Sequence, residues 1–174
     1  WRTEGGGAWR PVVGTPGGSG ALHALALDES GDAWTVWGDR LLRLDGGPPG
    51  ESFTLPGREV AVAARAGGGL WIGVRRGVAR FVDGRLSLLP IRPALEEKVH
   101  VIAPLSESAL WVATSGEVSR LDREANGSWR RSSVSLRLPE NITVRSLRLD
   151  GEGGLWVGTN GGGLRRVHSL PTRR

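Results

Sequence analysis

A motif built around a tryptophan occurs four times in the chain, and this repetition constrains the fold more than any other feature. The shared tryptophans are Trp34, Trp71, Trp111 and Trp156, so successive copies are 37, 40 and 45 residues apart. These spacings lie in the range of a four-stranded propeller blade. Within each copy, short β-branched and aromatic segments alternate with turns rich in Gly, Asp and Ser, which is typical of strands joined by tight turns.

We therefore expect an all-β fold, a partial β-propeller of about four four-stranded antiparallel blades that forms an open arc. The whole chain, 1–174, is predicted to be one propeller fragment. Its expected parts are the tail of a preceding blade at 1–20 and repeats at about 21–57, 58–97, 98–141 and 142–174. The 28 glycines and 10 prolines agree with many turns and few long helices.

The four tryptophans are expected to be structural anchors wedged between adjacent blades. Burying one removes on the order of 200 Å² from water, which contributes roughly 5 kcal/mol before entropy costs. The glycine-rich stretch 150–167 is interpreted as turns. No helix is expected after Gly163, and the stretch has no Gly-Lys-Ser/Thr ending, so it lacks the features of a phosphate-binding loop.

Composition argues against several classes of function. The chain has no cysteine, and its histidines are too scattered for a zinc site, so we predict neither a metal nor a cofactor. No triad, close carboxylate pair or nucleophile elbow stands out, so no catalytic residue is predicted. There is no apolar run long enough to span a membrane and no visible signal peptide. Since the chain also lacks methionine, even at position 1, we expect it to be a fragment.

The positive charge does not predict nucleic-acid binding. The net charge is +5, but 18 acidic residues are interspersed among 23 basic ones. The longest basic clusters are pairs: Arg75-Arg76, Arg130-Arg131, Arg165-Arg166 and Arg173-Arg174. A nucleic-acid surface normally shows a concentrated stripe with exposed aromatic side chains, so we expect neither DNA nor RNA as a partner.

Candidate binding residues are those that vary between copies but share one geometry. In a propeller, the loops before the first strand and after the second strand of each blade share one face, near the central channel. Positions eleven residues before each anchor, and three to five after it, fall there. The predicted ligand-binding residues are His23, Trp37, Asp39, Arg75, Arg76, His100, Arg145 and Asn160. An aromatic ring near Arg, His and Asn suits a sugar, particularly an acidic one.

The fourth copy also resembles a known family. Residues 144–167 read VRSLRLDGEGGLWVGTNGGGLRRV, which is similar to the two-component regulator propeller repeat. That repeat has a Val-led strand, then Asp-x-x-Gly-x-Leu-Trp-hydrophobic-Gly-Thr, a Gly-rich turn and a short strand. The second and third copies depart from it, since Arg65 and Leu105 replace the aspartate held by Asp28 and Asp150. The resemblance implies seven-bladed sensor propellers that face the periplasm or cell exterior and connect to a histidine kinase or diguanylate cyclase.

Three functions remain open after this comparison. The favoured hypothesis is a non-catalytic sensor segment of a bacterial signalling receptor that binds an oligosaccharide or another small ligand. Its expected partners are the remaining blades, a signalling output domain and, if the arc closes by pairing, a second copy; no membrane contact by this segment is expected. The alternatives are a propeller enzyme, a lyase or glycan-degrading enzyme similar to streptogramin lyases, and a secreted protein-interaction scaffold.

Overall fold

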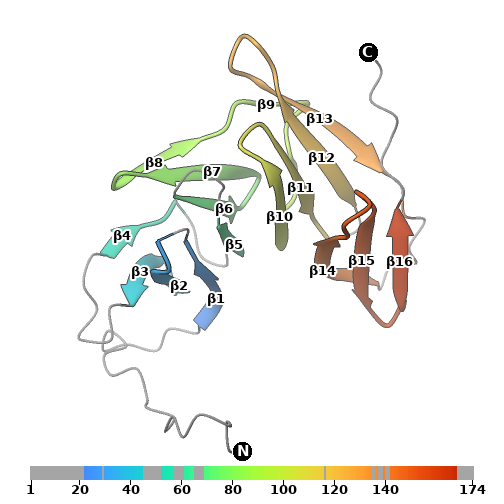
Figure 1. Cartoon of the computed structure of the whole chain (residues 1–174), viewed down its shortest axis with the longest axis horizontal. Helices are drawn as coiled ribbons and strands as arrows, with labels where there is room; N and C mark the ends of the chain where they lie inside the picture. Colours follow the sequence, from blue (N-terminus) through green and yellow to red (C-terminus); the bar gives the residue numbers. More distant parts are fainter. Residues whose placement is uncertain are drawn as a thin grey trace, which may run out of the picture.

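The structure is a computed structural model that describes residues 22–28, 30–44, 52–56, 61–64, 69–115, 117–134, 136, 139 and 142–167. For residues 22, 23 and 62–64 it describes the backbone alone. The predicted tail at 1–20 lies outside these residues. Figure 1 shows four separate sheets arranged as an arc, with the strand that begins the sheet order toward the inside.

The first two sheets each contain four strands in sequence order. The first sheet consists of β1 (Leu22–Leu27), β2 (Ala33–Trp37), β3 (Arg40–Leu44) and β4 (Ser52–Thr54). The second consists of β5 (Ala61–Ala64), β6 (Leu70–Val74), β7 (Gly77–Val82) and β8 (Arg85–Leu88). The anchor strands β2 and β6 lie second in each sheet with a neighbour on both sides, which explains their nearly continuous apolar sequence.

The third and fourth sheets follow the same order with two differences. The third consists of β10 (Val101–Ser106), β11 (Ala109–Ala113), β12 (Val118–Arg123), β13 (Trp129–Val134) and, at its outer edge, the short strand β9 (Ile91–Arg92). The fourth consists of β14 (Thr143–Leu149), β15 (Leu155–Asn160) and β16 (Leu164–Val167). Strand β9 precedes β10 in sequence but pairs in parallel with β13, so the chain reaches the outer edge of the third sheet before it enters the inner edge.

Three apolar cores lie between successive sheets, and all three have the same composition by repeat position. The first strands are neighbours in the order β1, β5, β10 and β14, which sets the order of the sheets around the arc. Each core combines one anchor tryptophan with the two residues that flank the next anchor. These flanking pairs are Leu70 and Ile72, Leu110 and Val112, and Leu155 and Val157. Side chains alternate between the two faces of a strand, so the inner anchor strands β6 and β11 each contribute to two cores, whereas β2 and β15 each contribute to one of the three cores described.

The anchor tryptophans differ in burial. Trp34, Trp71 and Trp111 are buried, and Trp71 is only 1% exposed. Trp156, which we expected to be buried as well, is 36% exposed. It lies on the face of the fourth sheet that points away from the third core, and no further sheet covers that face in the part of the chain that is described.

An aspartate fixes the turn before the anchor in the first and fourth sheets. One carboxylate oxygen of Asp28 accepts two backbone N–H groups of its turn, and the other accepts the indole N–H of Trp34 at 2.8 Å. Asp150 bonds in the same way to its own turn and to the indole of Trp156 at 2.9 Å. The glycine three residues after the aspartate, Gly153 in the fourth copy, has a φ of 80°, a conformation that favours glycine.

The prediction of an all-β partial propeller is confirmed. The predicted outer segments form β4, β8 and β13, and the glycine-rich stretch after Asp150 forms turns around β15. Across the described ranges there is no helix, and hence none with the length and apolar character to cross a membrane. The number of blades in the complete ring stays a prediction.

Candidate functional site

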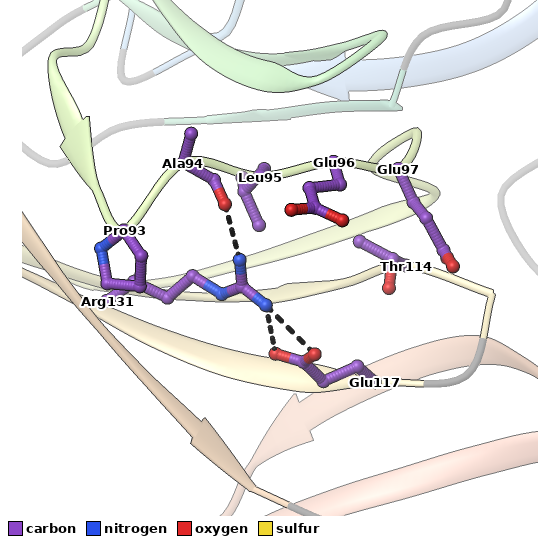
Figure 2. A pocket seen from close by; sticks show the side chains of 8 residues that line it. All are labelled: Pro93, Ala94, Leu95, Glu96, Glu97, Thr114, Glu117 and Arg131. Carbon is purple, nitrogen blue, oxygen red and sulfur yellow. Dashed lines mark hydrogen bonds and ion pairs between the residues drawn. The ribbon is translucent and has the colours of Figure 1, made fainter.

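A polar hollow of about 460 Å³ lies on the third sheet, beneath the segment that joins β9 to β10. We call residues 93–98 of this segment the connector, and the hollow the connector pocket. The connector crosses the face of the third sheet from its outer edge to its inner edge, and its Leu95 is buried in the core shared with the second sheet. The pocket is lined by Pro93, Ala94, Leu95, Glu96, Glu97, Thr114, Glu117 and Arg131 (Figure 2).

Arg131 fastens the connector to the sheet. Its Nη2 donates to both carboxylate oxygens of Glu117 at 2.7 and 2.9 Å, and its Nη1 donates to the Ala94 carbonyl oxygen at 2.6 Å. Its Nε donates to the Ser119 hydroxyl at 3.1 Å. The guanidinium side chain is only 15% exposed, and these bonds occupy each of its three nitrogen atoms. Arg131 therefore has a structural role and brings little unused positive charge to the pocket.

The same contacts keep Glu117 ionised. Burial by itself would raise the pKa of Glu117, but hydrogen bonds from Ser119, Ser133 and Arg131, together with the positive charge of Arg131, outweigh burial and lower this pKa below its usual value. At neutral pH, Glu117 is therefore a carboxylate whose charge is compensated by Arg131, whose Nη2 donates to both of its oxygens.

A second set of bonds joins the connector to the turn after β11. The Ser115 backbone N–H donates to a Glu97 carboxylate oxygen at 3.2 Å. The Ser115 hydroxyl oxygen lies 3.2 Å from Nε2 of His100, one of the predicted binding residues. The start of the first strand and the end of the second strand therefore meet at this face, as propeller geometry requires.

Two further polar side chains, those of Glu96 and Thr114, line the pocket. The Glu96 side chain is exposed and makes no hydrogen bond or ion pair within the described part of the chain. Thr114 is only 7% exposed, and its hydroxyl is not among the buried side-chain atoms of the described residues that lack a hydrogen-bond partner. The hydroxyl of the equivalent Thr159 of the fourth sheet donates to the Gly163 carbonyl oxygen at 2.8 Å.

The predicted binding residues of the first two sheets lie at strand ends. His23 falls in β1, but its side chain is outside the described residues. Trp37 ends β2 and is half-buried, and Asp39 follows it in an exposed turn. Arg75 and Arg76 form the exposed turn after β6, where Arg76 has a φ of 65°.

The remaining predicted residues lie at the same end of the third and fourth sheets. His100 directly precedes β10, Arg145 is an exposed residue near the start of β14, and Asn160 ends β15. None of the eight predicted residues lines the connector pocket. Sequence reasoning missed the lining residues because it compared equivalent positions between copies, whereas the connector belongs to one copy. The available signal was the acidic pair Glu96-Glu97 just before a first strand.

The family comparison identifies the repeat. Residues 137–161 match the model described as two component regulator propeller. This chain contains a two-component regulator propeller repeat. The resemblance seen in the fourth copy is thereby confirmed, and the matched segment includes the anchor Trp156 and its aspartate turn. Among curated proteins, none matches the sequence significantly.

Solved propeller structures resemble the whole arc that contains this repeat. The extracellular domain of BT4673 from B. thetaiotaomicron, described as part of a one component system, matches with a TM-score of 0.68 and 20% identity over 95% of this chain and 23% of that domain. The extracellular domain of BT3049 from the same organism, described as part of a hybrid two component system, gives 0.63 and 12% over 82% of this chain and 21% of that domain.

An enzyme has the same fold. Virginiamycin B lyase from Staphylococcus aureus matches with a TM-score of 0.66 and 14% identity over 91% of this chain and 59% of the lyase. At these identities the likeness shows the fold alone. The chain spans about a quarter of the BT4673 domain and a fifth of the BT3049 domain, which agrees with a partial propeller.

Proposed function

We propose that this chain is a non-catalytic ligand-sensing segment of an extracytoplasmic bacterial receptor of the two-component type. The observation that carries the proposal is the regulator propeller repeat at residues 137–161, which lies within a fold shared with extracellular domains of such systems. The segment would lie in the periplasm or outside the cell. Its partners would be further blades and a signalling output domain of a longer protein.

We place ligand binding on the face where the first strands begin and the second strands end. Two features support this choice. The connector pocket opens there and is lined by carboxylates, among them the exposed Glu96, and the predicted residues Asp39, Arg76 and Asn160 are exposed at the same ends of other sheets. Carboxylates, hydroxyls and Arg or Asn side chains are the groups that form several hydrogen bonds with the hydroxyls of a carbohydrate. The proposed ligand is therefore carbohydrate-like.

The test is binding of oligosaccharides to the purified chain, followed by hydroxyl-radical footprinting of any complex. The proposal predicts protection of residues on the connector face, such as Glu96 and Asn160, and no protection at the opposite strand ends, such as Asp83. Protection confined to the opposite ends would refute the placement, and failure of every glycan to bind would refute the carbohydrate assignment.

The likeness to virginiamycin B lyase supports an enzyme as the second candidate. The two functions differ in the fate of a bound ligand. A sensor segment returns its ligand unchanged after prolonged incubation, whereas a lyase or glycan-degrading enzyme converts it. Mass spectrometry of the ligand before and after incubation separates the two, and steady product formation would overturn the sensor proposal.

A further inference from the structure

One face of the fourth sheet, at an end of the arc, has no other sheet packed against it among the residues that the structure describes (Figure 1). We call it the end face. Strand register and the alternation of side chains place on it Ser146, Arg148, Trp156, Leu164 and Arg166. Two large apolar side chains are exposed there, since Trp156 is 36% and Leu164 is 64% exposed.

The counterparts of these two apolar side chains in the first three sheets are buried in the cores, and none is more than 6% exposed. For Trp156 the counterparts are Trp34, Trp71 and Trp111. For Leu164, which pairs with the residue two positions after its anchor, they are Leu41, Val78 and Val118. The end face therefore has the apolar positions of one side of a core.

The end face differs from the other three faces at the first strand. The residue that pairs there with the anchor tryptophan is Arg148 in the fourth sheet. In the first three sheets it is alanine, at Ala26, Ala63 and Ala103. Arg148 is exposed and makes no hydrogen bond or ion pair with the described residues, whereas Arg166 is bound to two carboxylates at 2.8 and 2.6 Å. Covering the end face would bury the unpaired charge of Arg148, which is costly unless an anion accompanies it.

A second copy of this chain does not fit the end face. The first strands of successive sheets are neighbours, so β1 of a second copy would lie against β14. The exposed side chains on the outward face of β1 are Leu25 and Leu27, which would meet Arg148 and supply no anion. Thr35 and Leu42, at the centre of the same face, are each only 2% exposed, so this part of the face is already covered within the chain.

We propose that the end face packs against a further β-sheet of the same protein that carries a carboxylate on its first strand. The carboxylate pairs with Arg148, because a charge-assisted hydrogen bond compensates the buried cation. Aliphatic side chains on both sides of the anchor of that sheet cover Trp156 and Leu164, in the way that Leu155 and Val157 contribute to the third core. This inference rests on the proposed receptor and extends it, since it states the chemistry of the neighbour that the fourth sheet requires.

The first test is hydroxyl-radical footprinting of the complete protein as it is encoded, compared with the 174-residue chain. Leu164 and Leu88 form a matched pair, because they are 64% and 62% exposed in the chain and only Leu164 lies on the end face. We expect the labelling of Trp156 to fall about sixfold or more in the complete protein, the ratio between its 36% exposure and the 6% maximum of its counterparts. The labelling of Leu164 should fall with it, and that of Leu88 should not change.

The second test locates the carboxylate. Lys98 is the single lysine of the 174 residues, so Arg148→Lys adds one identifiable amine and keeps the positive charge. A water-soluble carbodiimide joins an amine to a carboxylate in direct contact, and mass spectrometry of the peptides identifies the carboxylate. We expect a cross-link from the Arg148→Lys variant to an acidic residue of the further sheet. The control Arg85→Lys changes an exposed arginine of β8 and should give no cross-link to that sheet.

Each outcome supports or refutes the inference. Protection of Leu164 together with the expected cross-link supports it, and protection without the cross-link refutes the carboxylate. Labelling of Leu164 that is the same in the complete protein refutes the further sheet. Protection in the isolated chain that increases with concentration identifies a second copy as the occupant and also refutes the inference. A complete protein that binds an oligosaccharide while Leu164 stays labelled refutes this inference and leaves the proposed function in place, whereas protection and cross-linking without any glycan binding do the reverse.

Discussion

Replacing two equivalent tryptophans by alanine would test the rule that each anchor packs against the next sheet. Trp71 is 1% exposed, and its ring meets that of Trp129 edge-on at a centroid distance of 5.4 Å. Trp156 occupies the same repeat position but is 36% exposed. At about 25 cal/mol per Å², a fully buried tryptophan contributes roughly 5–6 kcal/mol of transfer free energy. Measured Trp→Ala costs in cores are about 3–5 kcal/mol.

We therefore expect Trp71→Ala to lower the free energy of unfolding by about 4 kcal/mol, because the substitution leaves a closed cavity between two sheets. Trp156→Ala should cost only about 1–2 kcal/mol. Its ring is partly in water and leaves no enclosed cavity, so the main losses are a partial apolar contact and the hydrogen bond to Asp150.

The measurement is urea unfolding followed by far-UV circular dichroism, which does not depend on the tryptophans as reporters. A change in the midpoint without a change in the slope would report stability alone. The reasoning would be refuted if Trp71→Ala cost less than about 1 kcal/mol, or if the two variants were equally destabilised within about 0.5 kcal/mol.

Three further predictions concern the turns and the connector. Asp28→Ala should cost about 2–3 kcal/mol in urea unfolding, because it leaves two turn N–H groups and the Trp34 indole without their acceptor, and a cost near zero would contradict this assignment. Glu117→Gln should destabilise the protein more at pH 7 than at about pH 3. The pKa of Glu117 is lowered on folding, so its carboxylate stabilises the fold above the unfolded pKa of about 4.3, and this contribution is lost as the pH falls through the folded pKa. Urea midpoints at both pH values check this, and a difference independent of pH would rule it out. Gly69→Ala should cost more than Gly31→Ala, which is expected to cost about 1 kcal/mol. Both glycines have a left-handed φ, but only at Gly69 would a Cβ also collide with the backbone carbonyl of Phe81, so equal thermal midpoints would be contrary to expectation.

Much of the fold was predictable because the same order of apolar segments and turns occurs in four copies, so each copy supports the strand assignment made in the others. The strands around Trp71, for instance, could be read from an apolar segment bounded by glycine turns, and the partner of that segment from the antiparallel order within a copy. The exposure of Trp156 was predicted wrongly. Its burial depends on whether another sheet covers that face of the fourth sheet, and the sequence of one repeat does not say which sheet packs against it.

The connector pocket could not be predicted in the same way. Its key contact joins Arg131 to Ala94, residues 37 positions apart, and no periodic pattern marks that pair. The pairing of β9 with β13 is what carries the connector over the sheet, and a two-residue strand leaves almost no trace in the sequence. Counting from the anchor predicted that His100 lies at the start of the first strand of its sheet, where the structure has it, but Glu96 and Glu97 belong to the connector, which the repeat pattern does not describe.

The path of the connector also determines which segment of the chain would have to be duplicated or exchanged to transfer the complete pocket. Every residue that lines the pocket lies between β9 and the end of β13, that is, within residues 91–134, which form the third sheet and the connector that crosses it. A duplication or recombination event that cuts just before residue 91 would transfer the complete pocket, whereas one that cuts between the connector and β10 would separate Glu96 and Glu97 from Thr114. A graft of residues 91–134 into another propeller would therefore carry the complete lining of the pocket with it.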